Sequence, residues 1–228
     1  MRSSGKALYL AAAAGPGMIA AQALAWFYAP VDAAMGITQK IFYCHVPLAW
    51  WALAAFLLNA LAGAVYLRTR EPKWDHLARA AGESGFVLAA LAFITGMIWA
   101  KCAWGVWWTA DPRLITFAVL CFMYAGYLLM RNSNLLGAIS GHKRAGLAAV
   151  WGILAGLNVP LLLLAARLLR GAHPTVFGAR GGGLEPEMLI TLLACLLAFG
   201  LIWMGILRLR FEQLRLGAAL HRLEAGHV

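Results

Sequence analysis

The sequence predicts an all-α, polytopic integral membrane protein with six transmembrane helices, and three observations support this fold class. Of its 228 residues, 63% are hydrophobic and only 12% are charged, which is too little polar surface to cover a water-soluble domain of this size. Several apolar runs approach the roughly 20 residues that cross a bilayer. Short connections separate these runs, so we expect residues 1–228 to form a single membrane domain.

The first three helices are predicted at 7–28, 41–67 and 82–101, because each range is an apolar run bounded by charged or turn residues. The first run follows a short basic segment and superficially resembles a signal peptide. It is too long for the apolar core of one and shows no clear cleavage pattern, so we expect an uncleaved first helix.

The last three helices are predicted at 114–131, 145–168 and 187–208 from the same pattern. The polar turn after Arg131 separates the fourth helix from the fifth, and a Gly- and Pro-rich segment separates the fifth from the sixth. The tail beyond Arg208 keeps a helical pattern, so we expect it to extend the sixth helix out of the membrane.

The basic residues indicate the orientation of the helices. The net charge is +10, but its lysines and arginines lie in clusters between apolar segments, which argues against a nucleic-acid-binding face. Thirteen of them fall on the side of the termini and six on the other side, so both termini are predicted to be cytoplasmic. The outer connections are then 29–40, 102–113 and 169–186, where we expect the functional residues.

The four cysteines are widely spaced and form no Cys-x-x-Cys pair, which argues against a disulfide framework or a zinc site. Cys44 precedes His45, but Ile41 stands where a c-type haem attachment motif needs its second cysteine. Gly181-Gly182-Gly183 lacks the Lys-Ser/Thr sequel of a phosphate loop. We therefore expect neither a c-type cytochrome nor an enzyme with its own nucleotide site.

The predicted topology places two histidines at the outer face of the membrane and four on the inner side. His45 and His173 lie at the outer face, at the start of the second helix and after the fifth. Both could reach one haem iron as axial ligands, since neutral imidazole is the metal-binding form. Each could instead be an ordinary interfacial histidine. The remaining four fall on the inner side: His76, His142, His221 and His227.

The outer connection 102–113 concentrates three tryptophans, Trp104, Trp107 and Trp108, within five residues. Tryptophan is common at membrane interfaces, but flat apolar rings beside Gly105 would also form a platform for a porphyrin. Asp111 and Arg113 would orient this loop or meet the haem propionates, and capping of the following helix or an Asp111–Arg113 pair is an equally good structural role. Four other tryptophans are interpreted as belt or packing residues: Trp26, Trp74, Trp99 and Trp151.

These motifs together resemble the CcmC family of cytochrome c maturation proteins, which belong to the haem-handling proteins with a tryptophan-rich WWD segment. The Trp104–Trp108 run with Asp111 and Arg113 is similar to that segment, and 41–50 resembles the family segment with the first outer histidine. His173 matches the second histidine, and 149–160 is similar to the family's fifth helix. This sequence departs from the pattern at Ala110, where the family has a further tryptophan, and at Pro112, where a small residue is common.

The resemblance implies a protein that binds haem b transiently between the two outer histidines and the tryptophan loop. It would deliver the haem to the chaperone CcmE on the periplasmic face of the bacterial inner membrane, together with CcmD and the ATP-driven subunits CcmA and CcmB. His45 and His173 would be the axial ligands, and the cofactor-binding residues would also include Trp104, Gly105, Trp107, Trp108, Asp111 and Arg113.

Two other classes of function fit this sequence less well. A membrane b-type electron carrier usually has haem ligands deep in its spans, and no pair of histidines stands on facing helices here. A solute permease usually has broken helices in corresponding positions and ionisable residues near the midplane, and this sequence offers few such residues.

Overall fold

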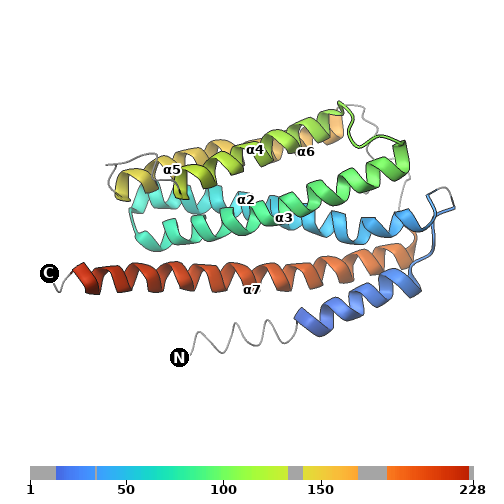
Figure 1. The fold of residues 1–228 in the computed structure, drawn as a ribbon, viewed down its shortest axis with the longest axis horizontal. Helices are drawn as coiled ribbons and strands as arrows, with labels where there is room; N and C mark the ends of the chain where they lie inside the picture. The colour runs from blue at the N-terminus through green and yellow to red at the C-terminus, as the bar shows by residue number, and fades with distance from the viewer. Residues whose placement is uncertain (1–13, 34, 133–140, 169–183, 226–228) are drawn as a thin grey trace.

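The protein is an elongated bundle of long helices that run roughly along a common axis (Figure 1). The computed structural model describes residues 14–33, 35–132, 141–168 and 184–225. Within these ranges the chain is helical apart from short turns and one isolated bridge between Asp32 and Gly36. After a helix over residues 14–23, the elements are η1 (Leu24–Tyr28), η2 (Ile37–Ile41), α2 (Phe42–Thr69), α3 (Pro72–Trp104), α4 (Pro112–Asn132), α5 (Gly141–Gly156), α6 (Asn158–Leu168) and α7 (Pro186–Ala225).

The predicted fold class is confirmed. Five helical stretches are long and apolar enough to cross a membrane: Ile37–Thr69, Pro72–Trp104, Pro112–Asn132, Gly141–Ala165 and Pro186–Ala225. The first predicted span, 7–28, is described only from residue 14, and its last turn is a π-helix closed by a bond from the Ala29 N–H to the Leu24 carbonyl at 2.9 Å. The cytoplasmic position of the termini stays a prediction.

Two of the predicted helices are more than ten residues shorter than the observed ones. The third helix was expected at 82–101 but begins at Pro72, where the missing proline N–H costs nothing in a first turn. Its first ten residues are too polar to form part of an apolar run, yet they belong to the same helix. The sixth helix reaches Ala225, which confirms the expected extension past Arg208.

The prediction of one continuous fifth helix over 145–168 is wrong. The structure divides it into α5 and α6, with a turn at Leu157 between them. Pro160 explains the interruption, because it has no N–H to donate and its ring collides with the carbonyl four residues earlier. The Asn158 amide then bonds the Thr116 carbonyl of α4 at 2.9 Å, which fixes the break against a neighbouring helix.

Helix α2 lies at the centre of the bundle and packs most extensively against α3. Its Phe56 stacks on Tyr124 of α4 with 3.6 Å between ring centroids, and the Tyr124 hydroxyl donates to the Phe56 carbonyl at 3.1 Å. Gly152 and Gly156 lie directly against α2, where any side chain would collide with it. Two glycines at this spacing let the backbones of α5 and α2 approach closely.

The bundle has two chemically different ends. We call one the aromatic end, formed by η2, the first turns of α2, α4 and α7, and the last turns of α3. The other is the basic end, formed by the first turns of α3 and α5, the last turns of α2 and α4, and the C-terminal half of α7. There Arg131 pairs with Asp75 and Arg210 pairs with Glu83. The described parts of all three predicted outer connections lie at the aromatic end.

Candidate functional site

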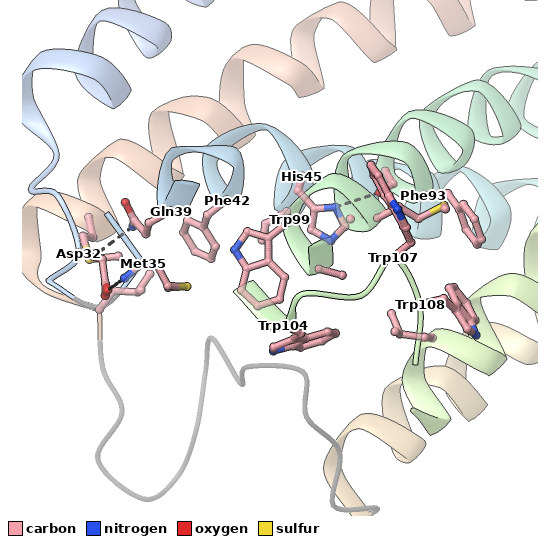
Figure 2. A pocket seen from close by; sticks show the side chains of 18 residues that line it. Asp32, Met35, Gln39, Phe42, His45, Phe93, Trp99, Trp104, Trp107 and Trp108 are labelled. Carbon is pink, nitrogen blue, oxygen red and sulfur yellow. Dashed lines mark hydrogen bonds between the residues drawn. The ribbon is translucent and has the colours of Figure 1, made fainter. Parts of the chain in front are cut away.

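A pocket opens at the aromatic end between four segments of the chain (Figure 2). Most of its wall is apolar or aromatic, and the side chains of Asp32, Gln39 and His45 are its main polar members. The lining residues are Asp32, Met35, Gln39, Phe42, His45 and Val46; Ala92, Phe93, Gly96, Met97, Trp99, Ala100 and Trp104; Trp107, Trp108 and Leu114; and Leu184 and Met188. The arrangement suits a flat, largely apolar ligand with one polar contact.

His45 lies in the first turn of α2 and leans against α3 (Figure 2). Its Nδ1 is 3.0 Å from the Ala92 carbonyl oxygen and 3.1 Å from Thr95 Oγ1. A carbonyl oxygen can only accept, so Nδ1 carries the ring proton and donates it to Ala92. The lone pair is then on Nε2, the arrangement in which neutral imidazole ligates a metal.

The three predicted tryptophans all reach the pocket, but through two kinds of local structure. Trp104 is the last residue of α3, and its ring meets that of Trp99 edge-on at 5.0 Å between centroids. Trp107 and Trp108 follow in the loop, where Trp108 stacks on Phe93 at 5.4 Å. Trp107 is 53% exposed and Trp108 38% exposed. Aromatic surface therefore remains uncovered at the mouth of the pocket.

Gly105 contributes to the loop through its backbone. It ends α3 in the left-handed conformation, with φ of 75°, and its N–H bonds the Lys101 carbonyl at 3.1 Å. Few residues other than glycine adopt this conformation readily, so Gly105 turns the chain out of the helix and brings Trp107 and Trp108 over the pocket. The Lys101 ammonium donates to the Gly105 carbonyl at 2.8 Å and lies 6.0 Å from the centre of the Trp107 ring.

Asp111 and Arg113 stand beside the pocket without lining it. The Asp111 side chain is buried and accepts a bond from the Arg113 N–H at 2.8 Å, two residues into the turn that starts α4. This is the geometry of a helix N-cap, so the predicted capping role of Asp111 is confirmed. It fixes the C-terminal boundary of the tryptophan loop.

The connection 29–40, one of the three expected outer connections, supplies a wall of the pocket, although no single residue in it stood out from the sequence. Asp32 accepts a bond from the Met35 N–H at 2.7 Å, and the buried Lys40 ammonium donates to the carbonyls of Ala29 and Pro30 at 2.5 and 3.3 Å. These bonds stabilise a compact turn. They place Met35, Gln39 and Phe42 along one side of the pocket.

Two pocket residues, Trp99 and Gly96, have no sequence signal that indicates a binding site, and three other residues with predicted roles have different outcomes. The sequence indicates a belt or packing role for Trp99, but this residue lines the pocket. Trp26 and Trp151 do lie at the surface, 54% and 41% exposed. Gly96 stands in an apolar run where a glycine usually indicates helix packing. His173, the second predicted ligand, lies outside the described residues.

Comparisons with known proteins converge on one family. A family model described as "Heme exporter protein C" matches residues 2–224. Curated proteins of that name share 34% identity over 131 residues in Rhodobacter capsulatus and 31% over 181 residues in Bradyrhizobium diazoefficiens. These matches cover 57% and 78% of this chain and 54% and 67% of the respective relatives. The relative in Escherichia coli K12 shares 34% identity over 137 residues, 59% of this chain and 54% of that protein. The chain thus spans about half the length of two of these relatives.

Proposed function

This chain belongs to the CcmC (heme exporter protein C) family, and we propose that it binds haem in the pocket at the aromatic end and delivers it to a CcmE-type chaperone during c-type cytochrome biogenesis. The haem would be haem b, bound transiently as cargo. The observation that carries the proposal is the His45 imidazole in the wall of a largely apolar and aromatic pocket, held in the tautomer that leaves Nε2 as the ligating atom.

The described residues fit a porphyrin in three respects. His45 would supply a nitrogen ligand for iron, and Phe93, Trp104 and Trp107 would supply flat apolar walls. The partly exposed ring of Trp108 would leave further apolar surface for the macrocycle. The Lys101 ammonium beside the Trp107 ring is positioned near the mouth, where a propionate would need a positive partner. Arg113 remains our second candidate for that contact.

The exposure of the platform favours handover over permanent storage. A carrier that keeps its haem would cover the ring on all sides, whereas Val106, Trp107 and Trp108 present apolar surface outward. Such surface suits a docking chaperone. Of the described histidines, only His45 lies at the pocket, whereas His76, His142 and His221 lie at the basic end. This distribution disfavours the alternative of a b-type electron carrier across the bilayer.

The orientation and the partners follow from the same proposal. The bias of Lys and Arg residues toward the basic end supports a cytoplasmic basic end, with the aromatic end at the periplasmic face of the inner membrane. We propose CcmA, CcmB and CcmD as the other members of the handover complex. Any dependence on ATP would enter through those subunits, and this chain would act by binding, orienting and releasing haem without enzymatic turnover.

The experiment is the absorption spectrum of the full-length protein purified with haem, alone and with its chaperone, for the wild type, His45→Ala, His173→Ala and the double variant. We expect the wild type to show a low-spin, imidazole-ligated spectrum. The amount of haem that co-purifies with His45→Ala should be at least about tenfold lower than with the wild type. His142→Ala is the matched control, because this histidine lies at the basic end and should leave the spectrum unchanged.

In the same preparations, transfer is measured as the amount of haem that becomes bound to the chaperone. Loss of transfer in His45→Ala with normal transfer in His142→Ala supports the proposal. Equal spectra and equal transfer in all variants would show that neither histidine ligates haem, and the site assignment would then be withdrawn.

A further inference from the structure

The Nδ1 atom of His45 is held by two groups of α3 that lie one helical turn apart. The Ala92 carbonyl accepts from it at 3.0 Å, and Thr95 Oγ1 stands at 3.1 Å. The single hydroxyl proton of Thr95 is directed to the backbone, with the Leu91 and Ala92 carbonyls 2.8 and 3.1 Å away. Thr95 Oγ1 therefore faces the imidazole as an acceptor, and both neighbours favour a proton on Nδ1.

Gly96 lets the imidazole reach these two acceptors. A Cβ built at Gly96 would lie 2.8 Å from Cε1, 3.4 Å from Nδ1 and 3.7 Å from Nε2 of His45. The ring therefore lies against bare backbone of α3, in space that any other residue would fill. Gly85 on the same helix is equally crowded, but its neighbours there are Ala55 and Phe56 of the core.

We infer that Thr95 and Gly96 are positioning residues for the His45 ligand, a role that rests on the proposed binding of haem by His45. Gly96 provides the space that sets the plane of the ring. Thr95, with the Ala92 carbonyl, fixes the Nδ1–H tautomer and keeps Nε2 as the nitrogen that bonds iron. Hydrogen bonds from the second ring nitrogen also make a ligating imidazole more basic, so Thr95 is expected to lower the reduction potential of bound haem.

The first test needs no haem. In full-length protein labelled with ¹⁵N-histidine, the nitrogen shifts of His45, assigned by their loss in His45→Ala, should show a single Nδ1–H tautomer. In Gly96→Ala the same signals should shift or split, because the ring loses its position. A wild-type His45 found as the Nε2–H tautomer would overturn the inference, whatever the protein binds.

The second test uses haem-loaded protein. Thr95→Val keeps the shape of the side chain and removes the acceptor, so the midpoint potential of the haem should rise, and Thr95→Ser should restore it. Gly96→Ala should lower retained haem by about ten- to a hundredfold or change its spin state. Gly85→Ala is the matched control: it should lower the unfolding temperature of the bundle and leave the spectrum of the remaining folded protein unchanged.

The outcomes separate this inference from the proposed function. If His45→Ala loses haem while Thr95→Val and Gly96→Ala keep the wild-type potential and spectrum, the positioning roles are wrong and the haem site stands. If His45→Ala itself keeps the wild-type spectrum, the haem site is wrong. A Gly85→Ala spectrum altered as much as that of Gly96→Ala would also overturn the inference, because the effect would then be a general consequence of crowding α3.

Discussion

At the basic end charged side chains pair across helices, whereas at the aromatic end rings surround an open pocket. The Arg131 guanidinium donates to both carboxylate oxygens of Asp75, at 2.6 and 3.1 Å. Glu83 accepts hydrogen bonds from Arg79 of its own helix and from Arg210 of α7. Among the described residues, the pocket instead has one histidine, which is bonded to α3, and a loop whose tryptophans are partly exposed. One end is built to hold helices in register, and the other leaves surface available for a ligand.

The largest effect on stability is expected when the ion pair between α3 and α4 is broken. In Asp75→Ala, the Arg131 side chain, only 6% exposed, would lose its carboxylate partner, which should cost about 3–5 kcal/mol of unfolding free energy. Thermal unfolding of the detergent-purified protein measures this. Glu212→Ala is the control, since its pair with the well-exposed Arg215 should contribute less than about 1 kcal/mol. The haem spectrum of folded Asp75→Ala should match the wild type, and a changed spectrum would contradict the independence of the two ends.

A smaller loss is expected at the contact between α3 and α7. Glu83→Gln keeps an acceptor but removes the charge that binds Arg79 and Arg210, and should cost about 2 kcal/mol. The same unfolding assay measures it, with haem retention as the second readout. Haem retention should stay at the wild-type level. A drop comparable to that of His45→Ala would mean that the basic end controls the pocket.

The tryptophan platform should behave in the opposite way. Trp108→Leu removes the ring that stacks on Phe93 and should weaken haem binding by about 1 kcal/mol, roughly fivefold, while the unfolding temperature changes little. Titration of apoprotein with haem measures the affinity. Trp151→Leu is the matched control, because this tryptophan is similarly exposed and its Nε1 bonds the Met123 carbonyl away from the pocket. Equal losses in both variants would refute a specific platform.

The smallest effect is expected from the two lysines that lie over tryptophan rings at opposite ends. Lys101→Gln should reduce haem affinity by about two- to fivefold, because an exposed cation–π contact and one bond to the loop are lost. Lys73→Gln removes the corresponding contact with Trp74 at the basic end and should leave haem affinity unchanged. An affinity that falls equally in the two variants would point to overall charge and not to the loop.

The sequence predicted the parts of the site that depend on local patterns. Three tryptophans within five residues indicated a platform, and the structure places all three at the pocket with His45. Asp111 before Pro112 indicated a helix cap, which is present. The fold class followed from long apolar runs, because a bilayer selects for them regardless of tertiary detail.

The missed features depend on contacts between distant segments. Gly96 and Gly85 are both small residues in one apolar helix, and only the structure shows that one faces the imidazole and the other the core. Trp99 has the character of a belt residue until the edge-on contact with Trp104 is known. The early start of α3 at Pro72 is not predicted because its first turns are polar, and a long apolar run does not extend into a polar part of a helix.

The most direct measurement of the central claim is a structure of the full-length protein loaded with haem. Our account predicts a porphyrin in the pocket at the aromatic end, with His45 Nε2 bonded to the iron, Nδ1 still donating to the Ala92 carbonyl, and the rings of the tryptophan loop along one face. A porphyrin bound elsewhere in the protein, or one in this pocket with His45 turned away from the iron, would contradict it.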